Sequence, residues 1–182
     1  NGGTATVNAF NKVSFAGILN GRAPLGYKIG TAYLDPATFD VGGTESTSYI
    51  YSYTTFDAWG NINIVGDVEI YQGATLNLYA DHLAVENGEG YDYIWDNVYD
   101  PGIGAIINTG EYTISGADGY LNLRAGSGIG TLENPVLTNV GTVSAEVTAG
   151  DVYIEQDGGD GTVDLGIASI SAPGHKVTIG SS

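Results

Sequence analysis

The sequence contains no cysteine and no methionine, and only five of its 182 residues are lysine or arginine. Without cysteine the chain has no disulfide and no reactive thiol, so its fold depends on packing and on sheet hydrogen bonds, and it tolerates an oxidising compartment. The five basic residues face 21 acidic ones, which gives a net charge of −16. Because so little basic surface is available to neutralise phosphates, this composition argues against partners such as nucleic acid or anionic membranes.

Long apolar runs and helical patterns are missing as well. No stretch approaches the roughly 20 apolar residues that span a membrane as a helix. No segment shows a convincing 3.6-residue repeat of apolar positions. The first residue is Asn1 rather than Met, and no signal peptide is recognisable. We therefore expect either a mature product or one segment of a longer polypeptide.

Glycine is abundant, with 29 residues, and it punctuates short alternating segments. Between Glu111 and Gln156, two apolar residues repeatedly flank one mostly polar residue. The pairs are Tyr112/Ile114, Leu121/Leu123, Val143/Ala145 and Val152/Ile154. Alternation places both members of a pair on one face of a strand. Strands this short and this frequent leave almost no room for helices, so we expect an all-β chain that winds on itself.

Similar pairs begin at Asn61. They are Ile62/Ile64, Val68/Ile70, Leu76/Leu78 and Leu83/Val85. A parallel β-solenoid, with one short strand on each side of a coil, suits this glycine spacing better than a β-sandwich with its longer strands; the sandwich is the alternative. At roughly 20–25 residues per coil, the chain would make about seven to nine coils. We expect one domain over residues 1–182, with regular coils at 61–182.

Residues 1–60 form a less regular opening part in this interpretation. The expected strands cover residues 4–10, 12–19, 27–34 and 38–41. The third strand would end at Asp35–Pro36, because proline cannot donate to a sheet ladder. The fourth would end at Gly42–Gly43.

Two aromatic-rich segments, residues 44–59 and 87–101, interrupt the pattern, and we expect both to be excursions from the coils. In the first, Tyr49, Tyr51 and Tyr53 alternate, which predicts one common side with Ile50 and Ser52 opposite. Such rings can cover the solenoid, form a subunit contact or stack on sugars. The candidate glycan or subunit contacts are Tyr49, Tyr51, Tyr53, Trp59, Tyr91, Tyr93 and Trp95.

The sequence offers no catalytic motif, and we expect the protein not to be an enzyme. His82 and His175 lie far apart in expected surface turns. The acidic groups that could serve a glycosidase are Asp92, Asp96 and Asp100, and Asp157, Asp160 and Asp164. We interpret both groups as exposed loop carboxylates, since catalysis would require a pair about 5–10 Å apart.

Residues 158–165 (GGDGTVDL) resemble a calcium-binding nonapeptide repeat. The aspartate falls one place late, and stacked copies are needed to complete such sites. We therefore expect no cofactor, with calcium at this segment as the alternative.

Residues 61–79, 119–138 and 139–157 resemble repeats of filamentous-haemagglutinin-type exoproteins of two-partner secretion. The Leu34–Asp35–Pro36 piece followed by Thr38–Phe39 is similar to another recurring element of these chains. The resemblance implies a right-handed parallel β-helix, export to the cell surface, and a role in adhesion or extracellular structure.

Neither end of the sequence shows an amphipathic cap: it opens with the strand pattern TATVNAF and closes with KVTIG. Uncovered solenoid ends can stack head to tail. We therefore expect an extracellular structural protein, a subunit or repeat segment of a surface fibre, that associates with itself. The alternatives are an adhesin or glycan-binding module and, less favoured, a carbohydrate-active enzyme.

Overall fold

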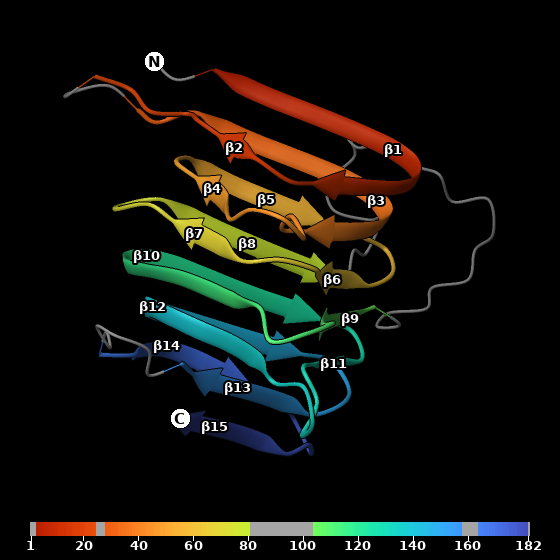
Figure 1. Ribbon diagram of the computed structural model, residues 1–182. Coiled ribbons are helices and arrows are strands. Elements are labelled where there is room, and N and C mark those ends of the chain that lie inside the picture. Colours follow the sequence, from red (N-terminus) through yellow and green to blue (C-terminus); the bar gives the residue numbers. More distant parts are fainter. Residues whose placement is uncertain (1–2, 25–27, 81–103, 158–163, 182) are drawn as a thin grey trace.

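The computed structural model describes residues 3–24, 28–80, 104–157 and 164–181, and within these ranges it contains strands and no helix (Figure 1). The strands are β1 (Thr4–Phe15), β2 (Ile18–Leu19), β3 (Thr31–Val41), β4 (Ser48–Ile50), β5 (Tyr53–Asp57), β6 (Ile62–Ile64), β7 (Val68–Ile70), β8 (Thr75–Ala80), β9 (Ala105–Asn108), β10 (Thr113–Ala125), β11 (Gly128–Ile129), β12 (Val136–Val147), β13 (Val152–Gln156), β14 (Gly166–Ser171) and β15 (Val177–Ser181).

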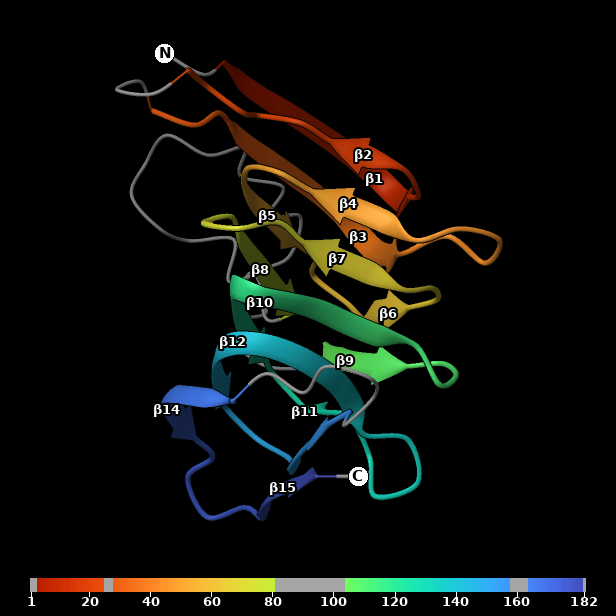
Figure 2. The ribbon, with the colours of Figure 1, turned by 60° about the vertical axis from the view of Figure 1, so that its left-hand side comes forward.

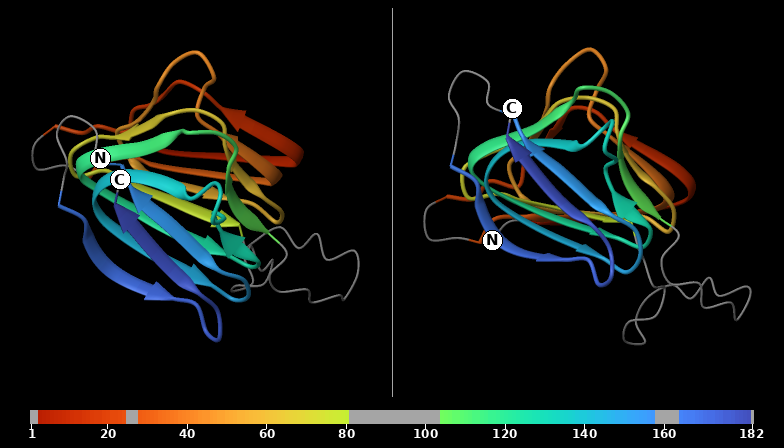
Figure 3. Two further views of the ribbon diagram at one scale, coloured as in Figure 1. Left: turned by 60° about the horizontal axis from the view of Figure 1, so that its bottom comes forward. Right: turned by 90° about the horizontal axis from the view of Figure 1, so that it is seen from below.

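All pairings between these strands are parallel, and strands inside the stack pair with strands of the coils before and after them. The result is a parallel β-solenoid of about six turns, which rises from β1 at one end to β14 and β15 at the other (Figures 1 and 2). Viewed close to the axis, the coils lie one behind another (Figure 3). The expected all-β solenoid is confirmed, and the β-sandwich is excluded.

The register defines three faces. Face A stacks residues 4–9 of β1, 31–36 of β3, β5, β8, 120–125 of β10, 142–147 of β12, and β14. Face B stacks residues 12–15 of β1, 38–41 of β3, β6, β9, β11, the start of β13 and the start of β15. Face C stacks β2, β4, β7, 113–116 of β10, 136–140 of β12, and the ends of β13 and β15.

Inward side chains form continuous apolar rows along the axis. One row of face A contains Val7, Leu34, Phe56, Leu78, Leu123, Ala145 and Ile170. The five inner members, from Leu34 to Ala145, are almost fully buried, and Phe56 also packs against Phe39 of face B with ring centroids 4.3 Å apart. The alternation noted at Leu76/Leu78, Leu121/Leu123 and Val152/Ile154 therefore does mark the core, because removal of these rows from water stabilises the coils.

Polar side chains form a second ladder on the outer side of face A. Asn77 donates from Nδ2 to Thr55 Oγ1 (3.1 Å) and Asn122 donates from Nδ2 to Asn77 Oδ1 (2.7 Å). Ser144 then donates from Oγ to Asn122 Oδ1 (2.6 Å). These bonds join four successive coils at one register position.

The coil repeat is 22 residues where it is regular, as from Thr55 to Asn77 and from Asn122 to Ser144. From Asn77 to Asn122 it is 45 residues, because that turn includes residues 81–103, which lie outside the described ranges. The expectation of seven to nine coils was therefore too high. The expected pair Leu83/Val85 and the excursion at 87–101 fall in the same undescribed part.

The opening part is more regular than expected. Asp35–Pro36 does not end a strand, since β3 continues to Val41, and one strand, β1, covers most of the two expected at 4–10 and 12–19. The β1–β3 register breaks between Ala9 and Lys12, where both strands pass from face A to face B. Pro36 lies at this corner, where a missing N–H costs the ladder little.

Residues 44–59 also belong mainly to the coils rather than to an excursion. β4 pairs with β2 and β7, and β5 pairs with β3 and β8. The sequence was misleading here because Thr54, Thr55 and Ser52 occupy buried positions that elsewhere carry apolar residues or amides. A hydrogen bond between Ser52 Oγ and Thr54 Oγ1 (2.8 Å) satisfies two of these hydroxyls.

Candidate functional site

The two ends of the solenoid expose residues that are buried everywhere else in the stack. In the face A row, Leu78 is fully buried, whereas Val7 in the first coil is 46% exposed. In the neighbouring row, Leu121 is buried and Ile167 in the last coil is 51% exposed. On face B, Val152 is buried and Val177 is 42% exposed. The core therefore opens at both ends into apolar surface, with no cap among the described residues.

The same ends present unpaired strand edges. At the N-terminal end, β1 pairs only with β3 and β2 only with β4, among the strands that the structure describes. At the C-terminal end, with the same restriction, β14 pairs only with β12 and β15 only with β13. On every face, the first and the last described strand therefore each have one edge whose backbone N–H and C=O groups pair with no other described strand.

The first coil is fixed to the second by an ionic contact on face B. Lys12 Nζ lies 2.5 Å from Asp40 Oδ2, and Asn63 of the third coil donates to Asp40 Oδ1 (2.9 Å). Burial alone would raise the pKa of Asp40, but the hydrogen bonds from Asn63 and Lys12 and the Lys12 charge outweigh it, so the pKa of Asp40 is lowered. In its charged form, the Asp40 carboxylate therefore stabilises the edge strand β1.

An aromatic cluster lies on the outer side of face C. The ring centroids of Tyr49 and Tyr51 are 6.2 Å apart, and those of Tyr51 and Tyr71 are 4.6 Å apart. The Arg22 guanidinium lies over Tyr51 and Tyr71, at 4.0 and 4.3 Å from their centroids. Sequence reasoning missed Tyr71 and Arg22. The signal that could have found Tyr71 is the repeated Ile-Tyr step at Ile50–Tyr51 and Ile70–Tyr71, because the pairing of β4 with β7 places these positions one coil apart.

The other aromatic candidates are not part of this cluster. Ile50 and Ser52 are buried opposite the tyrosines, as expected, but Tyr53 begins face A and is 44% exposed. Trp59 is 39% exposed beyond the end of β5, between faces A and B. Tyr91, Tyr93 and Trp95 lie outside the described residues. The structure therefore brings together Tyr49 and Tyr51 and separates them from Tyr53 and Trp59.

The acidic and histidine candidates form no described catalytic constellation. Asp157 accepts a hydrogen bond from Thr113 Oγ1 (2.9 Å), and Asp164 is exposed. Residues Asp92, Asp96, Asp100, Asp160 and His82, like most of segment 158–165, fall outside the described ranges. Within those ranges, no three His, Asp or Glu side chains are grouped as a metal site would require.

His175 lies in the last turn, as expected, with Nδ1 3.7 Å from Asp151 Oδ1. The backbone N–H of Lys176 and the hydroxyl of Tyr153 donate to the same carboxylate and lower the pKa of Asp151. These contacts fasten the loop between β14 and β15 to the preceding coil.

None of the described residues forms a helix with the length and apolar character needed to cross a membrane. The chain matches no protein-family model, no curated protein and no solved structure.

Proposed function

We propose that this chain is an extracellular structural protein, a subunit or repeat segment of a surface fibre that assembles head to tail through its open ends. The observation that carries the proposal is the contrast between Val152, which is fully buried, and Val177, which occupies the same row and is 42% exposed. An added coil would cover Val177 as β15 covers Val152.

Several contributions would stabilise contact between two ends. Covering the exposed half of a valine or isoleucine side chain contributes roughly 1 kcal/mol, and each end carries several such side chains. Pairing of the edge strands also satisfies backbone N–H and C=O groups that would otherwise be open to pairing with other chains. With side chains of the same kind at both ends, stacking of identical copies satisfies both ends at once and can continue without limit.

A surface location is supported by composition and by the coil pattern. The chain has no cysteine and a net charge of −16, which suits a soluble exported protein. The segments 61–79, 119–138 and 139–157, which resemble repeats of filamentous-haemagglutinin-type exoproteins, each correspond to about one coil. This resemblance is the reason to place the fibre at the cell surface.

The test combines electron microscopy with sedimentation velocity on the purified chain over a wide concentration range. We expect rods or filaments about one solenoid in width. Val177→Asp should abolish them, because it places a charge in the end row. Tyr120→Asp is the matched control, since Tyr120 is 50% exposed on the outer side of face A, away from both ends. A compact monomer at every concentration, or equal loss of rods in both variants, would contradict the proposal.

A second candidate is an adhesin or glycan-binding module, and the cluster of Tyr49, Tyr51 and Tyr71 on the outer side of face C favours it. Because the cluster lies on the outer side of the coils and not on an end row, it would stay accessible along a fibre. Tyr71→Ala should then remove binding on a glycan array and leave the sedimentation profile unchanged, whereas Tyr120→Ala should preserve both. An array on which the unsubstituted protein binds no glycan would eliminate this candidate.

A further inference from the structure

Resting on the proposed fibre, we infer that the partner at each end is a second copy in one defined polar register, with the C-terminal coil of one copy paired to the N-terminal coil of the next as if the solenoid continued. In this arrangement β14 pairs with residues 4–9 of β1 on face A. β15 pairs with residues 12–15 of β1 on face B and with β2 on face C.

The three faces provide the first support. Face A ends in β14, and faces B and C both end in β15. At the opposite end, face A and face B begin in β1, and face C begins in β2. Among the described residues, each face therefore has at each end one strand with an unpaired edge, and all strands run in the same direction. A rise of one coil, about 4.8 Å, is sufficient to pair every face.

The side-chain rows predict the register. In the row that contains Tyr33, Thr55 and Asn77, the first member is Thr6 and the last is Ser169. Two positions further along face A, the register places Asn8 in the first coil and Ser171 in the last. On face B, the row that begins at Val13 ends at Val177. Continuation of these rows places Thr6 beside Ser169, Asn8 beside Ser171, and Val13 beside Val177.

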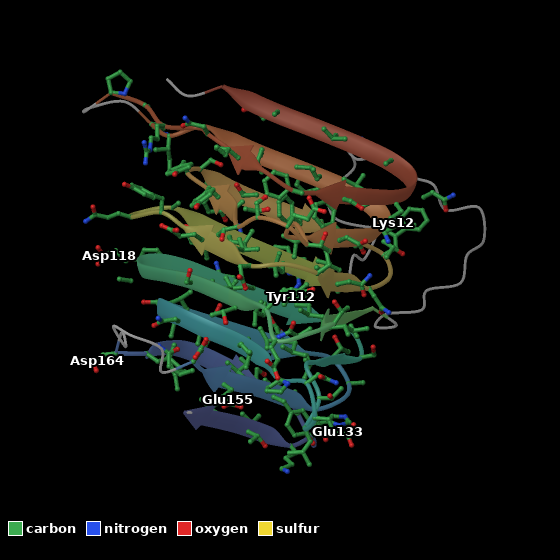
Figure 4. All side chains as sticks on the ribbon, viewed as in Figure 1. Lys12, Tyr112, Asp118, Glu133, Glu155 and Asp164 are labelled. Carbon is green, nitrogen blue, oxygen red and sulfur yellow. The ribbon has the colours of Figure 1, made fainter. Side chains whose placement is uncertain are left out.

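Charge supports the polarity. Residues 1–34 include Lys12, Arg22 and Lys28 and no acidic residue, whereas residues 35–182 carry all 21 acidic residues and only two basic ones. Lys12 lies toward the N-terminal end of the stack, and Glu155 and Asp164 lie toward the C-terminal end (Figure 4). Contact between two N-terminal ends would bring basic residues together, whereas head-to-tail contact places the basic end against a last coil without an excess of basic residues, since residues 164–181 contain Asp164 and Lys176.

Because the sequence has no cysteine, disulfide trapping can test the register without background thiols. The single variants are Thr6→Cys and Asn8→Cys in β1, and Ser169→Cys and Ser171→Cys in β14. All four positions are exposed. Each β1 variant is mixed with each β14 variant, oxidised, and analysed by non-reducing electrophoresis and peptide mass spectrometry.

The geometry predicts the outcome of the four mixtures. Paired positions on adjacent strands have Cα atoms about 4.8 Å apart, within the range that a disulfide bridges, whereas a shift of two residues increases this distance to about 8 Å. We expect the mixtures Thr6→Cys with Ser169→Cys, and Asn8→Cys with Ser171→Cys, to give at least tenfold more dimer than the two crossed mixtures. Mixtures oxidised in denaturant supply the random background.

Different outcomes would contradict the fibre, the register and the polarity. Absence of any rods or filaments counts against the proposed fibre itself. Filaments in which the crossed mixtures link as well as the matched ones would overturn the register while the fibre stands. Filaments of Thr6→Cys alone that link to themselves through position 6 would show contact between like ends and overturn the polarity.

A charge variant adds a readout that does not depend on disulfides. Lys28→Glu changes an exposed residue near the basic end. It should weaken assembly at low ionic strength and have a much smaller effect at 0.5 M salt, where charges are screened beyond a few ångströms. An equal effect at both salt concentrations would contradict charge-guided polarity.

Discussion

Val13 and Val177 occupy the first and last positions of one row on face B, a row whose inner members include Phe39, Ile62 and Val152. Val13 is half-buried and Val177 is exposed, whereas the three inner members are fully buried. The two valines therefore have the side chain of a core residue without the burial of one, because the stack of coils stops at each of them.

This relationship predicts that the cost of removing a valine depends on assembly. Val152→Ala should lower the free energy of unfolding by about 2 kcal/mol at any protein concentration, since its site is always buried. Val177→Ala should cost less than about 1 kcal/mol in the dilute monomer and approach the Val152→Ala value in the assembled protein. Denaturant unfolding at low and high concentration measures both, and a concentration-independent cost for Val177→Ala would refute the prediction.

The ladder of polar side chains on the outer side of face A predicts a loss of stability when Asn122 is replaced. Asn122→Ala removes the donor to Asn77 Oδ1 and the acceptor of Ser144 Oγ, and Asn77 is fully buried. A buried acceptor left without its donor costs about 1–3 kcal/mol. Asn134→Ala, in the exposed loop before β12, should change the free energy of unfolding by less than about 0.5 kcal/mol. Equal effects in urea unfolding would show that the ladder contributes nothing.

Two glycines separate backbone strain from steric overlap. Gly150 (φ 87°) and Gly73 (φ 73°) both adopt positive φ. A Cβ at Gly150 would overlap the carbonyl oxygen of Ser127 in the coil below, whereas a Cβ at Gly73 would meet no atom within 4 Å. Gly73→Ala should therefore cost only the conformational penalty of about 1–2 kcal/mol, and Gly150→Ala distinctly more. Thermal unfolding of the pair provides the test, and a smaller loss for Gly150→Ala would contradict it.

Asp40 predicts a pH dependence at the N-terminal edge. Its pKa is lowered in the folded protein, so its stabilising effect is fully present above the unfolded value of 3.8 and is lost as the pH falls through the lower folded value. The stability advantage of the unsubstituted protein over Asp40→Asn should therefore be larger at pH 7 than at pH 3. Comparison with this variant cancels the titration of the other carboxylates. An advantage that is constant over this range would exclude the predicted role.

Period-two alternation was sufficient to predict the core pairs at Leu76/Leu78, Leu121/Leu123 and Val152/Ile154, because each strand segment buries one side and local sequence records that side directly. It was insufficient at residues 44–59, where Thr54 and Ser52 satisfy each other's hydroxyls inside the stack, a compensation that depends on contacts and not on composition. It also could not show that β3 passes through Pro36, since the corner that tolerates the proline exists only once neighbouring coils are stacked.

At the candidate aromatic surface, too, the sequence predicted one part and contacts between coils decided the rest. Alternation correctly placed Tyr49 and Tyr51 on the side opposite Ile50, but only the stacking of coils brings Tyr71 and Arg22 against them.

By itself the sequence determined that this protein is an all-β chain with short alternating segments, abundant glycine and a strongly acidic composition, because these properties follow from residue type and local spacing. The tertiary structure decided which residues share a row and where each row ends. Register joins positions far apart in the sequence, such as Thr55 and Asn77 at 22 residues or Asn77 and Asn122 at 45, and the exposure of Val7 or Val177 depends on whether another coil lies beyond it.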